Sequence, residues 1–294
     1  MNYRVVHRTI YDYSETIASC HNEARLTPRN FERQTCTTNR LVIEPPPSDY
    51  RERQDFFGNQ VAYFSIQQPH KQLVVQAESE IQVHPTNAQL DYSMDMPWET
   101  VRANLETGID PVTLDARQYA LNSPMVSVSR DLEHYALLSF TKKRPIMDAV
   151  QNLMQRIHTD FAYDPTFTSI ATPLETVLKH RRGVCQDFAQ LAIGCLRSLG
   201  LSARYISGYV ETLPPPGKAR LIGADASHAW FSVYIPDYGW LDLDPTNNQK
   251  PMDRHITIAW GRDFADVTPL KGVLFGSGEH ELTVSVDVEP LNGN

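Results

Sequence analysis

The chain has 294 residues, enough for about two domains and a well-buried core. Its 27 Lys and Arg against 35 Asp and Glu give a net charge of −8, which argues against a nucleic-acid-binding surface. The N-terminus lacks a basic-then-apolar signal pattern, and no run of about 18 apolar residues occurs. We therefore expect a cytoplasmic protein that binds neither nucleic acid nor membranes.

The four cysteines are Cys20, Cys36, Cys185 and Cys195. None forms a Cys-x-x-Cys pair, which disfavours a structural zinc site, and no acidic calcium-binding loop occurs. In a reducing cytosol all four are expected to be free thiols, with a Cys20–Cys36 disulfide as the alternative. We expect no metal and no cofactor.

Residues 1–85 have the alternation of an all-β, sandwich-like domain. Residues 3–13 alternate with period 2 and are rich in strand-favouring side chains. A turn signal at 57–59 separates further strand-like runs, and Pro85 ends the pattern.

Residues 86–145 predict a helical connector that packs between two lobes. Trp98, Val101 and Leu105 fall at helical spacing, as do apolar residues that follow Ser129, a candidate helix cap.

Residues 146–294 predict an α+β domain, with helices first and antiparallel strands after them. An apolar stripe indicates a helix over 146–161, and Thr-Pro-Leu-Glu at 172–175 combines three helix-start signals. A third helix is expected over 185–199, ending at a glycine. The strands expected after it are 203–211, 226–235, 239–244 and 282–289.

Cys185 is the candidate nucleophile. It lies at the start of the helix predicted over 185–199, where unpaired N–H groups and the positive end of the helix dipole favour a thiolate. Arg181 and Arg182 precede it and add positive charge if they lie close. Taken alone, a cysteine at this place is more often a small buried apolar residue. A catalytic role therefore depends on whether a base and an orienting carboxylate lie nearby.

His228 is the candidate base, and Asp244 or Asp242 is the carboxylate that orients it. An isolated histidine on a strand is more often structural. Residue 236 lies midway between 228 and 244, in a Pro-Asp-Tyr-Gly turn. A hairpin centred there sets His228 opposite Asp244 to within a residue or two, which leaves Asp242 open.

Three blocks in this order resemble the transglutaminase-like superfamily: residues 183–189 (GVCQDFA), 227–230 (SHAW) and 240–246 (WLDLDPT). The first lobe and residues 255–263 also look like parts of a bacterial subfamily with an N-terminal β domain. The resemblance covers nearly the whole chain.

This resemblance implies a papain-like α+β core preceded by an all-β domain. It implies Cys185 as nucleophile, His228 as general acid and base, and Asp244 as the orienting carboxylate. Such a thiol enzyme forms a thioester from an amide and passes the acyl group to water or to an amine. We expect hydrolysis of peptide or protein amides, as in a cysteine protease. The alternatives are protein crosslinking by acyl transfer to lysine and a catalytically silent binding module.

A few other residues carry less weight. Tyr163 and Tyr209 could line a cleft, but an aromatic residue in the core is the better default. Cys195 falls on the apolar stripe of its helix and is expected in the core. The loop over 214–225 could border the cleft or be an ordinary surface loop. Three charged residues resemble a signature of the bacterial subfamily: Arg262, Asp263 and Asp266. The sequence does not reveal their role.

Overall fold

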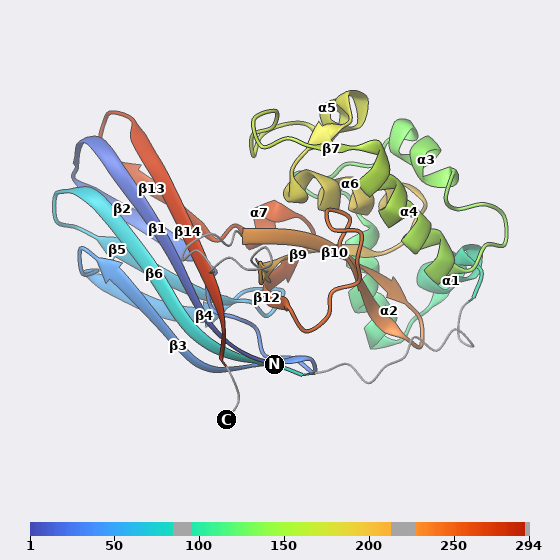
Figure 1. The fold of residues 1–294 in the computed structure, drawn as a ribbon, viewed down its shortest axis with the longest axis horizontal. Coiled ribbons are helices and arrows are strands. Elements are labelled where there is room, and N and C mark those ends of the chain that lie inside the picture. Colours follow the sequence, from blue (N-terminus) through green and yellow to red (C-terminus); the bar gives the residue numbers. More distant parts are fainter. Residues whose placement is uncertain (85–95, 213–226, 292–294) are drawn as a thin grey trace, which may run out of the picture.

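Figure 1 shows the chain as an all-β lobe beside a helical lobe. The structure is a computed structural model and describes residues 1–84, 96–212 and 227–291. Within these ranges no helix is long and apolar enough to cross a membrane. The α+β fold with an all-β N-terminal part is the one predicted.

The all-β lobe is a sandwich of two antiparallel sheets. Its strands are β1 (Asn2–Ile17), β2 (Ser19–Ala24), β3 (Gln34–Glu44), β4 (Asp49–Gln54), β5 (Gln60–Ile66), β6 (His70–Val83), β13 (Leu270–Phe275) and β14 (His280–Leu291). The sheet orders are β14-β1-β6-β3 and β13-β2-β5-β4. Between the sheets lies a hydrophobic core that includes Phe64 and Leu73. Alternate residues of β1 are buried, as expected of a strand with one face in a core.

The last two strands belong to this lobe, which corrects the predicted assignment of residues 146–294 to one catalytic core. Strand β13 pairs with β2, and β14 pairs with β1 so that Asn2 lies opposite Leu291. In Figure 1 β14, in red, runs beside β1, in blue. Alternation in the sequence predicts a strand but does not tell which strand it will pair with.

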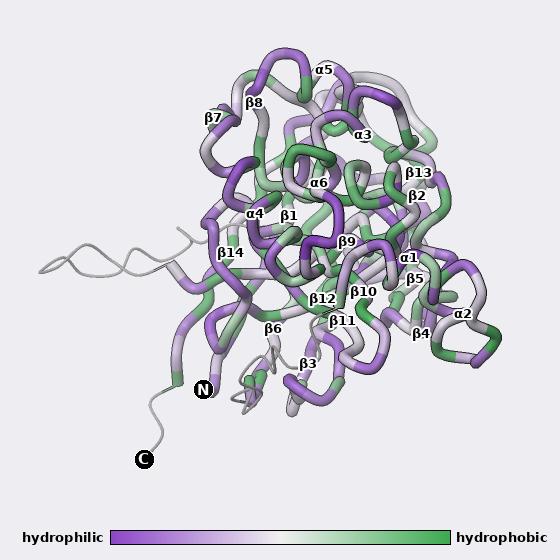
Figure 2. Tube along the Cα trace, turned by 90° about the vertical axis from the view of Figure 1, so that its right-hand side faces the viewer, coloured by the Kyte–Doolittle hydropathy of each residue, from purple (hydrophilic) through white to green (hydrophobic). Residues whose placement is uncertain are grey.

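The helical lobe contains the residues that were predicted to form a connector. Its helices are α1 (Trp98–Thr107), α2 (Pro111–Arg117), α3 (Arg130–Leu137), α4 (Ile146–Asp160), α5 (Leu174–His180), α6 (Cys185–Ser198) and α7 (Phe264–Val267), with a 3₁₀ turn at Gln118–Ala120. Helix α1 packs against α4, and α3 packs against α6, so residues of the predicted connector are part of this lobe. Trp98, Val101 and Leu132 belong to a hydrophobic cluster that also includes residues of the β lobe. Figure 2 looks onto the lobe and shows hydrophobic and hydrophilic stretches interspersed, as amphipathic helices require.

A third four-stranded sheet, outside the β lobe, positions the candidate site. Its strands are β9 (Ala203–Val210), β10 (Ser227–Ile235), β11 (Gly239–Leu243) and β12 (His255–Gly261). They are antiparallel, in the order β11-β10-β9-β12. Helix α6 packs on β9 and β10 on one side and against α3, α4 and α5 on others. A short parallel pair, β7 (Ala162–Tyr163) with β8 (Arg182–Gly183), leads into α6.

Candidate active site

Cys185 is the first residue of α6, at the end where backbone N–H groups have no partner within the helix. The residue is half-buried, and its thiol lies close enough to His228 on β10 to raise the pKa of that imidazole. Nearly all the rest of α6 is buried. The thiol therefore lies at a fixed point in the fold, where the helix dipole favours an anion.

Two neighbours shape the backbone at Cys185. A Cβ on Gly183 would lie 2.8 Å from Oδ2 of Asp187, so only glycine fits there. The Asp187 carboxylate accepts hydrogen bonds from the Val184 N–H (2.8 Å) and the Thr168 hydroxyl (2.7 Å). Burial raises the pKa of Asp187, although both hydrogen bonds act in the opposite direction. The first sequence block thus builds the helix start that presents the thiol.

His228 lies between Cys185 and Asp244. Its Nε2 is 2.8 Å from Oδ2 of Asp244. Because a carboxylate only accepts, Nε2 carries the proton of this bond, which leaves Nδ1 as the ring nitrogen available to the thiol. The fold thus brings the three predicted residues together in the order thiol, imidazole, carboxylate.

The charges of this group support one another. Burial lowers the pKa of His228, but its hydrogen bonds with Asp244 and Cys185 outweigh burial and raise that pKa to about 10. Burial likewise acts to raise the pKa of Asp244. Hydrogen bonds from His228, His255 and Asn247 outweigh it and hold the pKa well below the ordinary range. An imidazolium beside a carboxylate is therefore favoured at neutral pH.

Asp244 has no exposed surface, so its charge must be stabilised by hydrogen bonds and by the neighbouring imidazolium rather than by water. Oδ1 accepts from the N–H groups of Thr246 (3.0 Å) and Asn247 (3.2 Å) in the turn after β11. Oδ2 also accepts from the Asn247 amide at 2.8 Å and from His255 Nε2 at 3.2 Å. Sequence reasoning gave no role to Asn247, which directly follows the third block, or to His255, which begins the 255–263 segment.

The two candidate carboxylates are clearly separated. Ser232 lies opposite Asp242 in the β10–β11 pairing and donates a 2.6 Å hydrogen bond to it. Arg33 of the β lobe is 4.0 Å from Asp242 on another side. The pairing ends one residue before Asp244, whose side chain reaches His228 from the following turn.

The other predicted residues divide between the site and the core. Tyr163 lies near the site, since its pKa is raised by burial and then by the Cys185 thiol. Tyr209 lies elsewhere: it is buried, and its hydroxyl is 2.7 Å from His7 of β1. Cys195 is fully buried in the core, as expected.

The charged signature has a structural role. Arg262 pairs with Asp266 through Nε (2.9 Å) and Nη2 (3.0 Å). Asp263 is fully buried and accepts hydrogen bonds from the N–H groups of Met125 (2.7 Å) and Ala265 (2.9 Å). These contacts fix the chain after β12 against the helical lobe.

Three residues here could serve as metal ligands. The candidate ligand atoms of His228, Asp244 and His255 lie within 4.8 Å of one another, and imidazole and carboxylate groups of this kind bind zinc. The Asp244 oxygen, however, already accepts hydrogen bonds from both imidazoles, which an ion would have to break. Metal independence stays a prediction.

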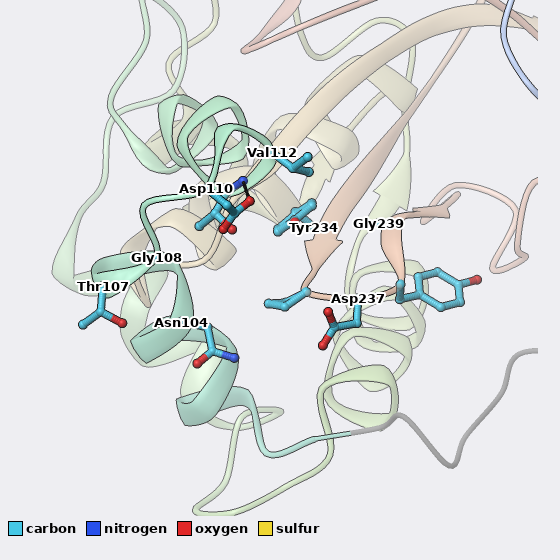
Figure 3. Close-up of a pocket in the computed structure, with 11 residues that line it drawn as sticks. Asn104, Thr107, Gly108, Asp110, Val112, Tyr234, Asp237 and Gly239 are labelled. Atoms are coloured by element: carbon cyan, nitrogen blue, oxygen red, sulfur yellow. Dashed lines mark hydrogen bonds between the residues drawn. The ribbon is translucent and has the colours of Figure 1, made fainter.

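A cavity of about 550 Å³ lies away from these residues (Figure 3). It is lined by Asn104 and Asp110 from the α1–α2 region and by Tyr234 and Asp237 at the turn end of β10. His228 lies near the opposite end of that strand, so the cavity is not part of the candidate site. The loop predicted to border the cleft, 214–225, lies outside the described residues.

The sequence matches two family descriptions, the bacterial transglutaminase-like N-terminal region over residues 3–82 and the transglutaminase-like superfamily over residues 137–245. An uncharacterised protein of Mycobacterium tuberculosis is 44% identical over 99% of this chain and 94% of its own. A protein-glutamine gamma-glutamyltransferase of Pseudomonas aeruginosa is 34% identical over 35% of this chain and 16% of its own.

Among solved structures, a proposed cysteine protease from Cytophaga hutchinsonii has the same fold. Its TM-score is 0.75 at 20% identity, covering 100% of this chain and 92% of that one. Fold and site together define an α+β protein of the papain-like class in which a cysteine, a histidine and an aspartate lie close together. The chain belongs to the transglutaminase-like superfamily, in its bacterial branch with an N-terminal β region.

We predict that iodoacetamide at mildly acidic pH modifies Cys185 before the other three cysteines, which are also free thiols. Cys20 and Cys195 are buried, and burial raises the pKa of Cys195 to about 12. Cys36 is the matched control because it is half-buried like Cys185, yet burial raises its pKa. Peptide mass spectrometry that finds Cys36 labelled as fast as Cys185 would contradict the prediction.

We predict that Asp244→Asn lowers kcat by a factor on the order of 10²–10⁴, because the imidazole loses its orienting carboxylate. Asp242→Asn, the matched control, removes a charge that faces Ser232 and Arg33 rather than His228, and should lower kcat far less. Without the Asp244 charge the pKa of His228 falls from about 10, so the alkaline limb of the pH–kcat profile should move toward neutral pH. An equal loss in the Asp242 variant would reverse the assignment.

Proposed function

We propose that this protein is a cysteine-dependent enzyme that cleaves amide bonds of peptides or proteins through a thioester on Cys185. The observation that carries the proposal is the series Cys185–His228–Asp244, in which the imidazole is 2.8 Å from the carboxylate and interacts electrostatically with the thiol. One end of the series is a half-buried thiol at a helix start, and the other is a fully buried carboxylate. A thiol that only filled space would need neither partner.

The reaction proceeds in two stages. The Cys185 thiolate bonds to the amide carbonyl carbon, and the oxygen becomes an oxyanion that accepts hydrogen bonds from backbone N–H groups at the start of α6. The C–N bond then breaks as the His228 imidazolium gives its Nδ1 proton to the departing amine, leaving a thioester. Water attacks the thioester, His228 takes up a proton, and the thiolate departs. Asp244 keeps Nε2–H oriented in both stages.

Transfer of the acyl group to an amine is the second candidate. A relative named protein-glutamine gamma-glutamyltransferase supports it, over 35% of this chain. We favour hydrolysis, because water hydrolyses a thioester unless a bound amine excludes it.

The cytoplasmic location stays a prediction.

The test is a screen of peptide and glutamine-donor libraries with wild type, Cys185→Ala and, as a matched control, Cys36→Ala. We expect wild type and the Cys36 variant to release amine or ammonia, and the Cys185 variant to be inactive. A labelled primary amine then distinguishes the two candidates, since only acyl transfer incorporates the label into product. Turnover that persists in Cys185→Ala would refute the proposal.

A further inference from the structure

His255 holds a second hydrogen-bonding position on the buried carboxylate. It is the first residue of β12, only 6% exposed, with Nε2 at 3.2 Å from Oδ2 of Asp244. Because a carboxylate only accepts, His255 donates through Nε2–H. Burial, ahead of every other influence, lowers the pKa of His255, which favours the neutral ring with Nδ1 as a bare acceptor. His255 therefore acts as an uncharged donor.

The packing around the ring agrees with this tautomer. Trp230 lies edge-on to it, with ring centroids 5.2 Å apart and an interplanar angle of 86°. Among the described residues, neither Nδ1 of His255 nor Nε1 of Trp230 has a hydrogen-bond partner. Both residues line a cavity of about 10 Å³ with Arg33 and Asp242. That volume is about enough for one water, which can accept from the indole N–H and donate to the bare Nδ1.

Strand β12, which carries His255, is an edge strand of the catalytic sheet. Its outer edge is not left open, because two side-chain amides of the β lobe pair with it as a neighbouring strand would. The Gln34 amide exchanges two hydrogen bonds with the backbone of Thr257, both 2.8 Å. The Asn59 amide does the same with Trp260, at 2.8 and 3.0 Å.

These two amides are well fixed. Gln34 and Asn59 are 1% and 0% exposed. Arg29, also from the β lobe, donates to the Asn59 side chain and stacks its guanidinium 3.6 Å above the Trp260 ring. An unpaired edge can move, whereas one bonded at two points to a second lobe holds its register. The β lobe thus sets the position of β12, and β12 sets the position of His255.

We propose that His255 is a positioning residue that holds Asp244 in the orientation that His228 requires, and that the N-terminal β lobe contributes to catalysis by fixing β12 through Gln34 and Asn59. The inference rests on the proposed function. It gives the β lobe a role in the reaction that requires no contact with substrate.

The direct test compares His255→Gln, whose amide can still donate to the carboxylate, with His255→Leu, which cannot. We expect His255→Leu to lower kcat by about 10²-fold with KM nearly unchanged, since a misplaced group of this kind costs about that much. His255→Gln should retain most of the activity. The low-field proton resonance of His228 Nε2–H should persist in the Gln variant and disappear in the Leu variant.

Two results would overturn the assignment: full kcat in His255→Leu, or equal losses in the Leu and Gln variants when both are folded by circular dichroism. Neither is confused with failure of the proposed function. That function fails only if Cys185→Ala stays active, and this variant is run in the same assay.

The role of the β lobe is tested with Gln34→Met, which keeps the side-chain length but cannot pair with β12. The matched control is Gln72→Met, an exposed glutamine of the same lobe that bonds Asp12. We expect a lower kcat in the first and no change in the second. If Gln34 acts through His255, Gln34→Met should cause little further loss in the His255→Leu background. Fully additive losses would contradict this coupling.

Discussion

The candidate site depends on one buried carboxylate. Asp244 has no exposed surface, and an ionised group in that position costs several kcal/mol unless hydrogen bonds replace its water. Its donors come from three separate segments: His228 on β10, Asn247 in the turn after β11, and His255 on β12. All three segments must be in place before the charge is satisfied, so the sheet and the site form together.

The same dependence joins the two lobes. One continuous hydrophobic cluster runs from Tyr3 and Val288 of the β lobe to the residues of α6. Strands β1 and β14, the first and last that the structure describes, pair with each other. The helical lobe is therefore an insertion in the sequence between two parts of the sandwich. Contacts of such long sequence separation form late in folding. Because the two lobes share a hydrophobic cluster, the β lobe forms one assembly with the sheet of β9, β10, β11 and β12 and is not an appended module.

Local patterns were sufficient to predict much of this arrangement. Period-2 alternation identified strands such as β1, β10 and β14, and three ordered motifs predicted Cys185, His228 and Asp244 as the site residues. The hairpin midpoint was only approximate: the observed register places residue 237 at the turn centre, because Ile235 pairs with Gly239. Neither the partner of β14 nor the contact between His255 and Asp244 could be predicted, because both depend on how distant segments dock, which no local spacing encodes.

Whether Cys185 carries the acyl group is tested most directly by rapid-quench mass spectrometry with an activated peptide ester, whose thioester forms faster than it hydrolyses. We predict an adduct with the mass of the acyl group on the peptide that contains Cys185, present in wild type and released by hydroxylamine. It should form in step with the burst of alcohol product and be absent from Cys185→Ala. An acyl group on another residue, or a product burst without any adduct on Cys185, would contradict the mechanism.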